Sequence, residues 1–305
     1  MNTSWITELT ERNNDLSLND IILPSTHNSH CTKVTTSRAI SQNSPIPLLS
    51  KIPCISPCVS GWAINQTLNT LEQLKSGVRV IDIDASWDLQ TNSWVCSHSY
   101  FISVLNEPLE QIKTFLDDYN DPVILNISPR VNVNNKLEDL AGIIRTLFNP
   151  YIFPPQNDFN FSIRDNMLVT NKKLIIIWNY RTNPDTQLYW SRAMYNGHWV
   201  QSNEIQPALD KIQIKLDEYP NKKTVSALNE LSWVLTPETN NIVNGLLCCN
   251  YANLRCLMDD MNDYFEEFFV ENCSKIVDKI NNISFDFITV HIINLIISLN
   301  KTINR

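Results

Sequence analysis

Residues 21–30 read Ile21-Ile22-Leu23-Pro24-Ser25-Thr26-His27-Asn28-Ser29-His30. Two later stretches have the same form, Gly77-Val78-Arg79-Val80-Ile81-Asp82-Ile83-Asp84 and Trp94-Val95-Cys96-Ser97-His98. Each begins as a short apolar run, typical of a buried parallel strand, and ends in a side chain that can move a proton or hold a metal. In a (β/α)₈ barrel the carboxyl ends of the strands carry the chemistry. The three stretches therefore predict acid/base work at one end of such a barrel, with a divalent cation as an option.

The rest of the chain alternates between apolar runs and segments with helical spacing. We expect strands at 18–23, 78–83, 94–97, 122–127, 173–178, 198–200, 230–235 and 283–288. We expect helices at 66–76, 108–119, 136–148 and 207–219, a largely helical region at 248–280 and a last helix that ends at Leu299. This alternation predicts an α/β fold with a parallel sheet, a (β/α)₈ TIM-barrel-like domain that is irregular or incompletely closed. We expect one domain over residues 1–305.

Composition limits the function classes. The chain has 305 residues, 43% of them hydrophobic, which is ample for a large core. Its net charge of −8 argues against a nucleic-acid binder. Only five glycines occur, so Gly-rich phosphate loops are excluded and a phosphate must be held by side chains, a metal or helix ends.

The termini and cysteines bear on localisation. The first residues lack the basic and apolar regions of a signal peptide, and polar residues interrupt the apolar stretch 283–299, which fits a strand and a helix better than a membrane span. We therefore expect a cytoplasmic or peripheral membrane protein. Cys54 and Cys58 could form a disulfide in a secreted chain, whereas free buried thiols are expected in a cytosolic one.

At several places the sequence resembles a known family, the X domain of phosphatidylinositol-specific phospholipase C, a phospholipase C-like phosphodiesterase. The stretch Leu23 to Ser29 looks like the opening of that domain, and 66–84 looks like its helix and second strand. His98 stands where the family has its second histidine, 121–127 resembles the fourth strand, and 283–288 looks like the last. The resemblance covers an X-domain-like core of about 18–178, with the remainder of the barrel at 179–305.

The resemblance implies cleavage of an inositol phospholipid to diacylglycerol and a cyclic inositol phosphate. The inositol 2-hydroxyl must lose a proton and the departing glycerol oxygen must gain one. Two imidazoles can do both near neutral pH. By resemblance His27 is the base or transition-state stabiliser, and His98 is the general acid.

The family has two branches, and Asn28, Asp82 and Asp84 make this chain look like the calcium-dependent one. Asp82 and Asp84 are two positions apart, so both side chains point to one side of a strand, and their oxygens suit Ca²⁺. That branch also has an acidic ligand where Ser128 stands here. Metal affinity could be weaker, water could complete the shell, or Arg130 could supply part of the positive charge.

Arg130 and Arg181 are the candidate substrate-binding residues. Near the fifth strand only Arg181 follows Trp178-Asn179-Tyr180, and the basic cluster that recognises ring phosphates is not obvious. Unphosphorylated phosphatidylinositol, or a related lipid, is therefore favoured over its bisphosphate.

Other candidates have weaker support. His30, His198 and His291 are expected in surface or core roles, and Arg79 in a surface ion pair away from the site. Asp286 either orients a histidine from below or pairs with a helix. The segment 45–62 either inserts shallowly into a lipid interface or packs under its own loop.

Two rival functions stay open. The first is another lipid phosphodiesterase on the same barrel, such as a glycerophosphodiesterase or a sphingomyelinase D-like enzyme, although these usually carry an acidic residue where Asn28 and Ser29 stand. The second is a catalytically degenerate module that binds membranes or a protein partner, which Ser128 would suit. The expected partners are a phospholipid substrate and a transient membrane surface.

Overall fold

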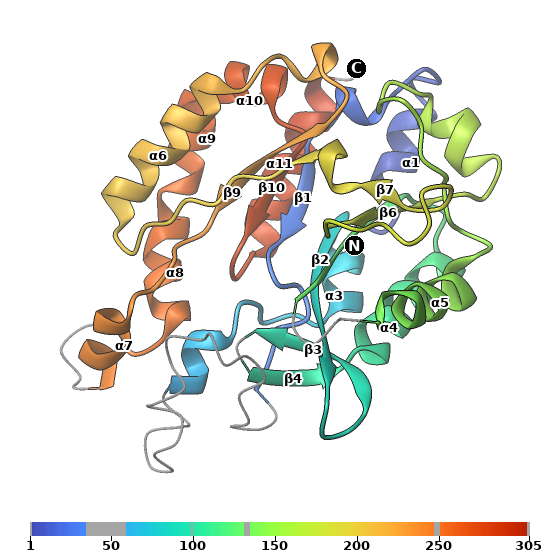
Figure 1. The fold of residues 1–305 in the computed structure, drawn as a ribbon. Helices are drawn as coiled ribbons and strands as arrows, with labels where there is room; N and C mark the ends of the chain where they lie inside the picture. The colour runs from blue at the N-terminus through green and yellow to red at the C-terminus, as the bar shows by residue number, and fades with distance from the viewer. Residues whose placement is uncertain (1, 35–58, 99, 131–134, 247–250, 304–305) are drawn as a thin grey trace.

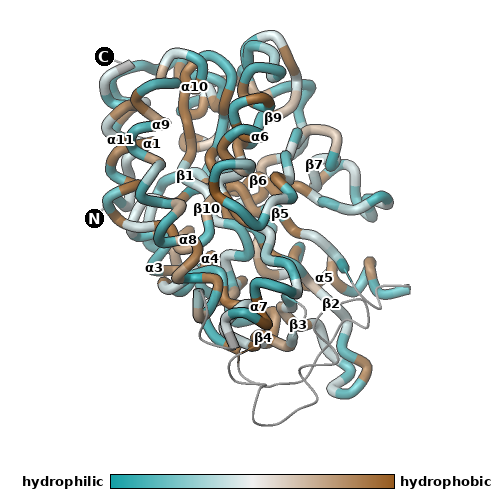
Figure 2. The backbone as a smooth tube through the Cα atoms, turned by 90° about the vertical axis from the view of Figure 1, so that its left-hand side faces the viewer, coloured by the Kyte–Doolittle hydropathy of each residue, from teal (hydrophilic) through white to brown (hydrophobic). Residues whose placement is uncertain are grey.

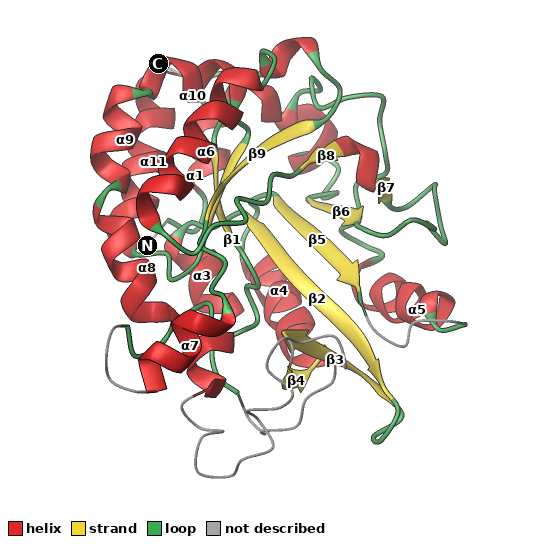
Figure 3. Cartoon of the chain, turned by 60° about the vertical axis from the view of Figure 1, so that its left-hand side comes forward, coloured by secondary structure: helices red, strands yellow, loops and turns green. Residues whose placement is uncertain are grey.

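The computed structural model describes residues 2–34, 59–98, 100–130, 135–246 and 251–303. A curled parallel sheet fills the centre, and helices surround it (Figures 1 and 3). Its order is β7-β6-β5-β2-β1-β10-β9-β8. The strands are β1 (Leu23–Thr26), β2 (Val80–Asp88), β5 (Val123–Pro129), β6 (Leu174–Trp178), β7 (Trp190–Ser191), β8 (Tyr195–Asn196), β9 (Leu228–Trp233) and β10 (Asn282–Phe285).

The sheet is a nearly closed barrel. Every neighbouring pair along it is parallel. The end strands β7 and β8 do not pair with each other in the part of the chain that the structure describes. The two strands have only two residues each, and the turn η5 (Arg192–Met194) separates them. The predicted (β/α)₈-type barrel, irregular and incompletely closed, is confirmed.

The helices cover the outer face of the sheet. They are α1 (Trp5–Thr10), α3 (Thr70–Ser76), α4 (Asn106–Asp118), α5 (Leu137–Phe148), α6 (Ile205–Glu218), α7 (Thr239–Leu246), α8 (Leu254–Asp263), α9 (Phe265–Glu271), α10 (Cys273–Lys279) and α11 (Val290–Ile303). The short 3-10 helices are η1 (Leu18–Asp20), η3 (Gly61–Ala63) and η6 (Lys222–Thr224), and η4 (Arg164–Leu168) is a π-helix. The helical region expected at 248–280 is thus three successive helices, α8 to α10.

The third expected strand is not a barrel strand. Strand β2 extends beyond the barrel to Asp88, and β3 (Ser93–His98) folds back antiparallel against it. A further antiparallel strand, β4 (Tyr100–Val104), completes this extension. Asn92, at a φ of 50°, makes the turn, since asparagine tolerates the left-handed region better than most residues. The extension carries His98 to the rim of the barrel.

Two other expected strands are displaced. Residues 18–20 form the turn η1, because Ser17 and Asp20 cap it reciprocally, so the first strand begins only at Leu23. The strand expected at 198–200 was a wrong prediction, since these residues form no regular element and β8 lies at Tyr195–Asn196. Trp199, in the middle of the expected strand, is 45% exposed, whereas a strand buried in the barrel would cover this side chain.

Buried apolar residues of the strands and of the helices packed on them form one core. In Figure 2 hydrophobic positions alternate with hydrophilic ones along the strands and helices. Every residue of β5 and β6 is buried, as expected for central parallel strands. Arg79 lies at the other end of β2 from Asp88, where it forms an ion pair with Asp121 at 2.7 Å. Both side chains are wholly buried, so the expected surface pair is a buried one.

Some sequence-based expectations fall elsewhere. Residues 45–58 of the lipid-insertion segment, with Cys54 and Cys58, lie outside the described residues. At the end of that segment Trp62 is buried. Among the described residues, none of the helices combines the length and apolar character needed to cross a bilayer.

Candidate active site

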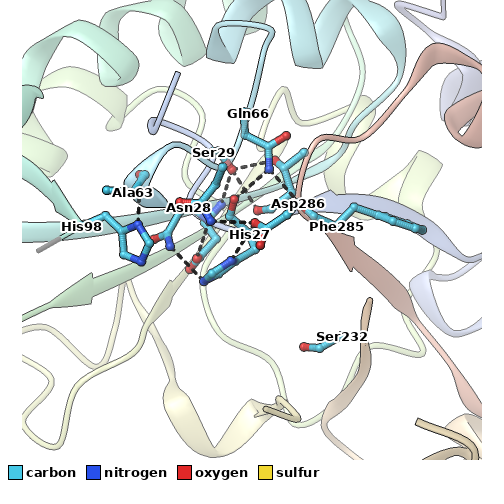
Figure 4. A network of polar contacts seen from close by, with 12 residues as sticks. His27, Asn28, Ser29, Ala63, Gln66, His98, Ser232, Phe285 and Asp286 are labelled. Atoms are coloured by element: carbon cyan, nitrogen blue, oxygen red, sulfur yellow. Dashed lines mark hydrogen bonds and ion pairs between the residues drawn. The ribbon is translucent and has the colours of Figure 1, made fainter. Parts of the chain in front are cut away.

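The pairing of the first and last strands builds the centre of the site. Thr26 of β1 lies opposite Phe285 of β10, so the residues that follow, His27 and Asp286, emerge side by side. The Asp286 carboxylate accepts a hydrogen bond from Nδ1 of His27 at 2.9 Å (Figure 4). Gln66 fixes both strand ends, because its Nε2 donates to the carbonyls of His27 and Phe285 at 2.8 Å each. Of the two roles weighed for Asp286, the structure has the one that orients a histidine.

Two residues with strained backbone directly follow His27 and Asp286. Asn28 has a φ of 44° and Phe287 of 52°. These left-handed values are costly for a side chain such as Phe287, and such residues are concentrated at functional sites in proteins. Phe287 is held in place because its N–H donates to the carbonyl of Asn65 at 2.7 Å. This hydrogen bond therefore holds the loop after Asp286 in its strained conformation.

His98 lies across from His27. The centroids of the two rings are 6.1 Å apart, and the rings are close to perpendicular. Nδ1 of His98 lies 3.1 Å from the carbonyl oxygen of Ala63 and donates to it, which leaves Nε2 free to exchange a proton. The structure therefore brings together the two histidines that the sequence singled out.

The register of β2 and β5 places four polar side chains in a row. Asp82 lies beside Asn126, and Asp84 lies beside Ser128. Asp82 accepts from the Asn126 amide at 2.9 Å and from the Asn28 backbone N–H at 3.1 Å. Asp84 accepts from Nε of Arg130 at 2.7 Å. Arg130 thus neutralises one of the two carboxylates that the resemblance assigns to a metal.

The same side chains can be tested as calcium ligands. Oδ1 of Asn28, Oδ1 of Asn126 and Oγ of Ser128 are buried and have no hydrogen-bond partner among the described residues. Buried polar atoms are rarely left unpaired, so unsatisfied oxygens beside two carboxylates fit a hard cation such as Ca²⁺. No third acidic, histidine or cysteine side chain joins the cluster within the described chain. The set fits calcium in its chemistry, with Arg130 as a competitor for Asp84.

The charges of the site oppose one another. Burial disfavours a charged His27, but the Asp286 carboxylate outweighs it, and together with Asp82 and Asp84 it raises the pKa of His27 to about 9. Burial and the charge of His27 lower the pKa of His98. Burial and repulsion by Asp84 raise the pKa of Asp82 to about 6. At neutral pH the site therefore holds one protonated imidazole, His27, and one neutral imidazole, His98.

A polar cavity of about 280 Å³ opens beside His27 and Asp82. Apart from those two and Arg130, its lining includes Asn126, Asn179, Arg192, Tyr195, Glu230 and Ser232. Trp199 also lines it, with its ring edge-to-face against His27 at 5.0 Å. Sequence reasoning missed most of these residues, because single Asn, Ser and Tyr residues on short strands carry no pattern in an Asn-rich chain.

The remaining candidates have different places. Arg181 does not line the polar cavity; its guanidinium lies over the ring of its neighbour Tyr180, and Arg192 of η5 supplies the second arginine instead. His198, expected in a surface or core role, lines the cavity. His30 is a buried core residue, and burial lowers its pKa to about 4. His291 pairs on the surface with Glu266.

Comparison with known proteins gives the class first. Over 98% of both chains the fold matches phosphatidylinositol-specific phospholipase C from Listeria monocytogenes, with a TM-score of 0.66 and 17% identity. A structure of the S. aureus phosphatidylinositol-specific phospholipase C covers 98% of this chain and 97% of its own, with a TM-score of 0.65 and 13% identity. The fold is thus the TIM barrel of the bacterial phosphatidylinositol-specific phospholipases C.

The family follows from the sequence. Residues 61–178 match the family described as phosphatidylinositol-specific phospholipase C, X domain. PI-PLC X domain-containing protein 3 from Danio rerio is 20% identical over 250 residues, which cover 79% of this chain and 76% of the relative. Its Homo sapiens counterpart is 19% identical over 254 residues, covering 79% and 77%. The chain is similar to the PI-PLC X-domain family over these residues, and the resemblance stated from the sequence is confirmed.

Proposed function

We propose that this protein cleaves the phosphodiester of phosphatidylinositol-type lipids and releases diacylglycerol and a cyclic inositol phosphate. The observation that carries the proposal is the His27–Asp286 pair facing His98, with ring centroids 6.1 Å apart, beside a polar cavity. This spacing suits a phosphoryl group between two proton-transfer groups.

In the proposed reaction the 2-hydroxyl of the inositol ring attacks phosphorus. Its proton passes to Nε2 of His27, the bond between phosphorus and the glycerol oxygen breaks, and that oxygen takes a proton from Nε2 of His98. Asp286 holds the Nδ1–H of His27 and so fixes the ring. When His27 is neutral, its Nε2 accepts a hydrogen bond from the Asn28 amide nitrogen at 2.9 Å. Protonation of Nε2 breaks this contact, and in the neutral form the substrate hydroxyl would replace it.

Without substrate, the protonation states of the two histidines are the reverse of those that the reaction needs. His27 is protonated and His98 neutral at neutral pH, because Asp286 raises one pKa while burial lowers the other. The productive form, with His27 neutral and His98 protonated, is therefore a minor one. The anionic phosphodiester between the rings favours a proton on His98, which offsets part of this cost.

The polar cavity supports a ring without added phosphates. Asn126, Asn179 and Ser232 offer neutral groups suited to ring hydroxyls. Of the two arginines in the lining, Arg130 is already paired with Asp84, which leaves Arg192. We propose unphosphorylated phosphatidylinositol as the substrate, met during transient contact with a membrane surface.

Calcium is part of the proposal. Asn28, Asp82 and Asp84 would hold it, and the ion would supply positive charge to the phosphoryl oxygens. Arg130 contributes positive charge at the same place, since its guanidinium lies on Asp84. The two sources can be separated by experiment, because a chelator removes only the first.

The direct test incubates the protein with phosphatidylinositol vesicles and identifies products by phosphorus NMR. We expect cyclic inositol phosphate and diacylglycerol from wild type, and a loss of at least a hundredfold in His27→Ala and His98→Ala. Release of free choline or glycerol phosphate from other lipids would instead identify another phosphodiesterase. Vesicle binding without turnover, with or without calcium, would identify a binding module.

A further inference from the structure

A second cavity, of about 180 Å³, adjoins the site. We call it the apolar cavity, and its lining includes Trp62, Leu235, Ile242 and Leu254 beside His98. It shares His27 and Trp199 with the polar cavity, whereas His98 lines only the apolar one. The two histidines therefore stand between a polar space and an apolar space.

Two side chains that line the apolar cavity have a buried polar atom without a hydrogen-bond partner among the described residues. These atoms are Nε1 of Trp62 and Oγ1 of Thr236. Both can donate, and buried donors normally find an acceptor. An apolar cavity with a few polar groups is the usual form of a ligand site. The unpaired donors fit a ligand that combines hydrocarbon with a carbonyl oxygen.

We propose that the apolar cavity is a leaving-group subsite for the proximal part of one ester-linked acyl chain, with the ester carbonyl accepting hydrogen bonds from Trp62 and Thr236. This inference rests on the proposed function, because it takes His98 as the donor to the glycerol oxygen when the bond to phosphorus breaks. The geometry then fixes the direction of the substrate. The hydroxyl-rich ring occupies the polar cavity, and the lipid side occupies the cavity that His98 lines.

The subsite predicts recognition of single lipid molecules. For a lipid dissolved in water, burial of the first carbons of an acyl chain in the cavity favours binding, whereas in a bilayer or micelle those carbons are already out of water. Soluble lipids should therefore be good substrates without any interface. Glycerophosphoinositol, which has the same phosphodiester and no acyl chains, should be a poor one.

The test compares three soluble substrates below their critical micelle concentrations: dihexanoyl phosphatidylinositol, its dihexyl ether counterpart and glycerophosphoinositol. Wild type should show the highest kcat/KM for the diester. Thr236→Val removes one donor and keeps the side-chain shape. Trp62→Phe removes the other donor and keeps one aromatic ring. Each should lower the ratio of diester to ether kcat/KM by about three- to tenfold, the usual effect of one hydrogen bond. Thr302→Val, on the exposed face of α11, is the matched control and should keep the wild-type ratio.

The outcomes separate the two proposals. Equal kcat/KM for all three substrates, or wild-type ratios in both donor variants, would overturn the subsite and leave the proposed function standing. If wild type cleaves none of the three soluble substrates and no lipid in vesicles, the proposed function itself is overturned. Thermal melting of each variant shows whether the fold is intact, and a lower ratio in an intact variant supports the subsite.

Discussion

Asp286 accepts a hydrogen bond from Nδ1 of His27 at 2.9 Å, although 259 positions separate the two residues in the chain. The pairing of the first and last strands brings the two residues together, so the His27–Asp286 pair exists only once this side of the barrel has formed. The second oxygen of Asp286 is buried and unpaired among the described residues. The oxygen that faces His27 also accepts a hydrogen bond from the Asn65 amide at 2.9 Å, which holds the carboxylate in place beside the ring.

The first prediction concerns pH. The rate requires one neutral and one protonated imidazole, so kcat/KM should fall above the higher pKa, that of His27, at about pH 9. Asp286→Asn keeps the shape and removes the charge that raises this pKa. We expect the basic limb of the profile to move to lower pH in this variant. A limb that stays near pH 9 would show that another group controls it.

The same pair makes stability depend on pH. The folded-state pKa of His27 lies above its ordinary value of 6.5, so the folded protein binds this proton more tightly than the unfolded chain. The stabilisation is complete below pH 6.5 and is lost as the pH rises through about 9. Urea unfolding between pH 6 and 10 measures the loss. Asp286→Asn should show a smaller decrease over this range than wild type.

The second prediction concerns the cation. Arg130 competes with calcium for Asp84, so Arg130→Gln should bind calcium about tenfold more tightly, while Asp82→Asn should lose most of the affinity. Isothermal titration calorimetry measures both without any need for turnover. Arg255→Gln, an exposed arginine paired on the surface, is the control.

Two results would contradict the calcium proposal. One is the absence of binding heat in wild type and in Arg130→Gln alike. The other is activity that survives a chelator but falls in Arg130→Gln, which would make the guanidinium the working cation.

The sequence predicted the parts of the fold that are continuous apolar runs. Strand β6 is such a run and β5 begins as one, and both were placed within two residues of their observed bounds. Strands β7 and β8 have two residues each and are too short to carry a periodic signal. The antiparallel extension was missed for another reason: an apolar run gives no direction, so β3 read as one more parallel strand.

The residues of the candidate site also fall into two groups, those that the sequence pattern revealed and those that it did not. His27, Asp82 and Asp84 directly follow or end apolar runs, and this position made them visible. Trp199 lies in an irregular segment and reaches His27 only through the folding of the loop after β8. Arg192, in η5 between β7 and β8, lines the polar cavity, whereas the predicted Arg181 does not. Such placements depend on tertiary structure, which local pattern does not encode.

The third prediction concerns stability away from the site. Arg79 is wholly buried; it donates to Asp121 and also to the carbonyls of Leu74, Val78 and Asn2. Arg79→Met leaves the Asp121 charge buried without its partner, which should cost about 3–5 kcal/mol in urea unfolding. The double variant Arg79→Met, Asp121→Asn should recover part of this loss. Arg255→Met, at an exposed pair, should change nothing measurable, and an equal effect at both sites would refute the argument.

The fourth prediction concerns Trp199, which separates the polar and apolar cavities and packs edge-to-face on His27 with ring centroids 5.0 Å apart. Trp199→Ala joins the cavities, admits water beside the phosphoryl position and frees the His27 ring to rotate. An aromatic pair of this kind contributes about 1 kcal/mol beyond its buried area, so kcat/KM should fall about tenfold once the loss of the wall is included. Trp199→Phe keeps an aromatic wall and should retain most of the activity. Tyr264→Ala removes a similarly exposed aromatic side chain on another part of the surface and serves as the control. Since Trp199 is half exposed, all three variants should melt within a few degrees of wild type, which assigns any loss of activity to the site; full activity in Trp199→Ala would show that the wall has no part in catalysis.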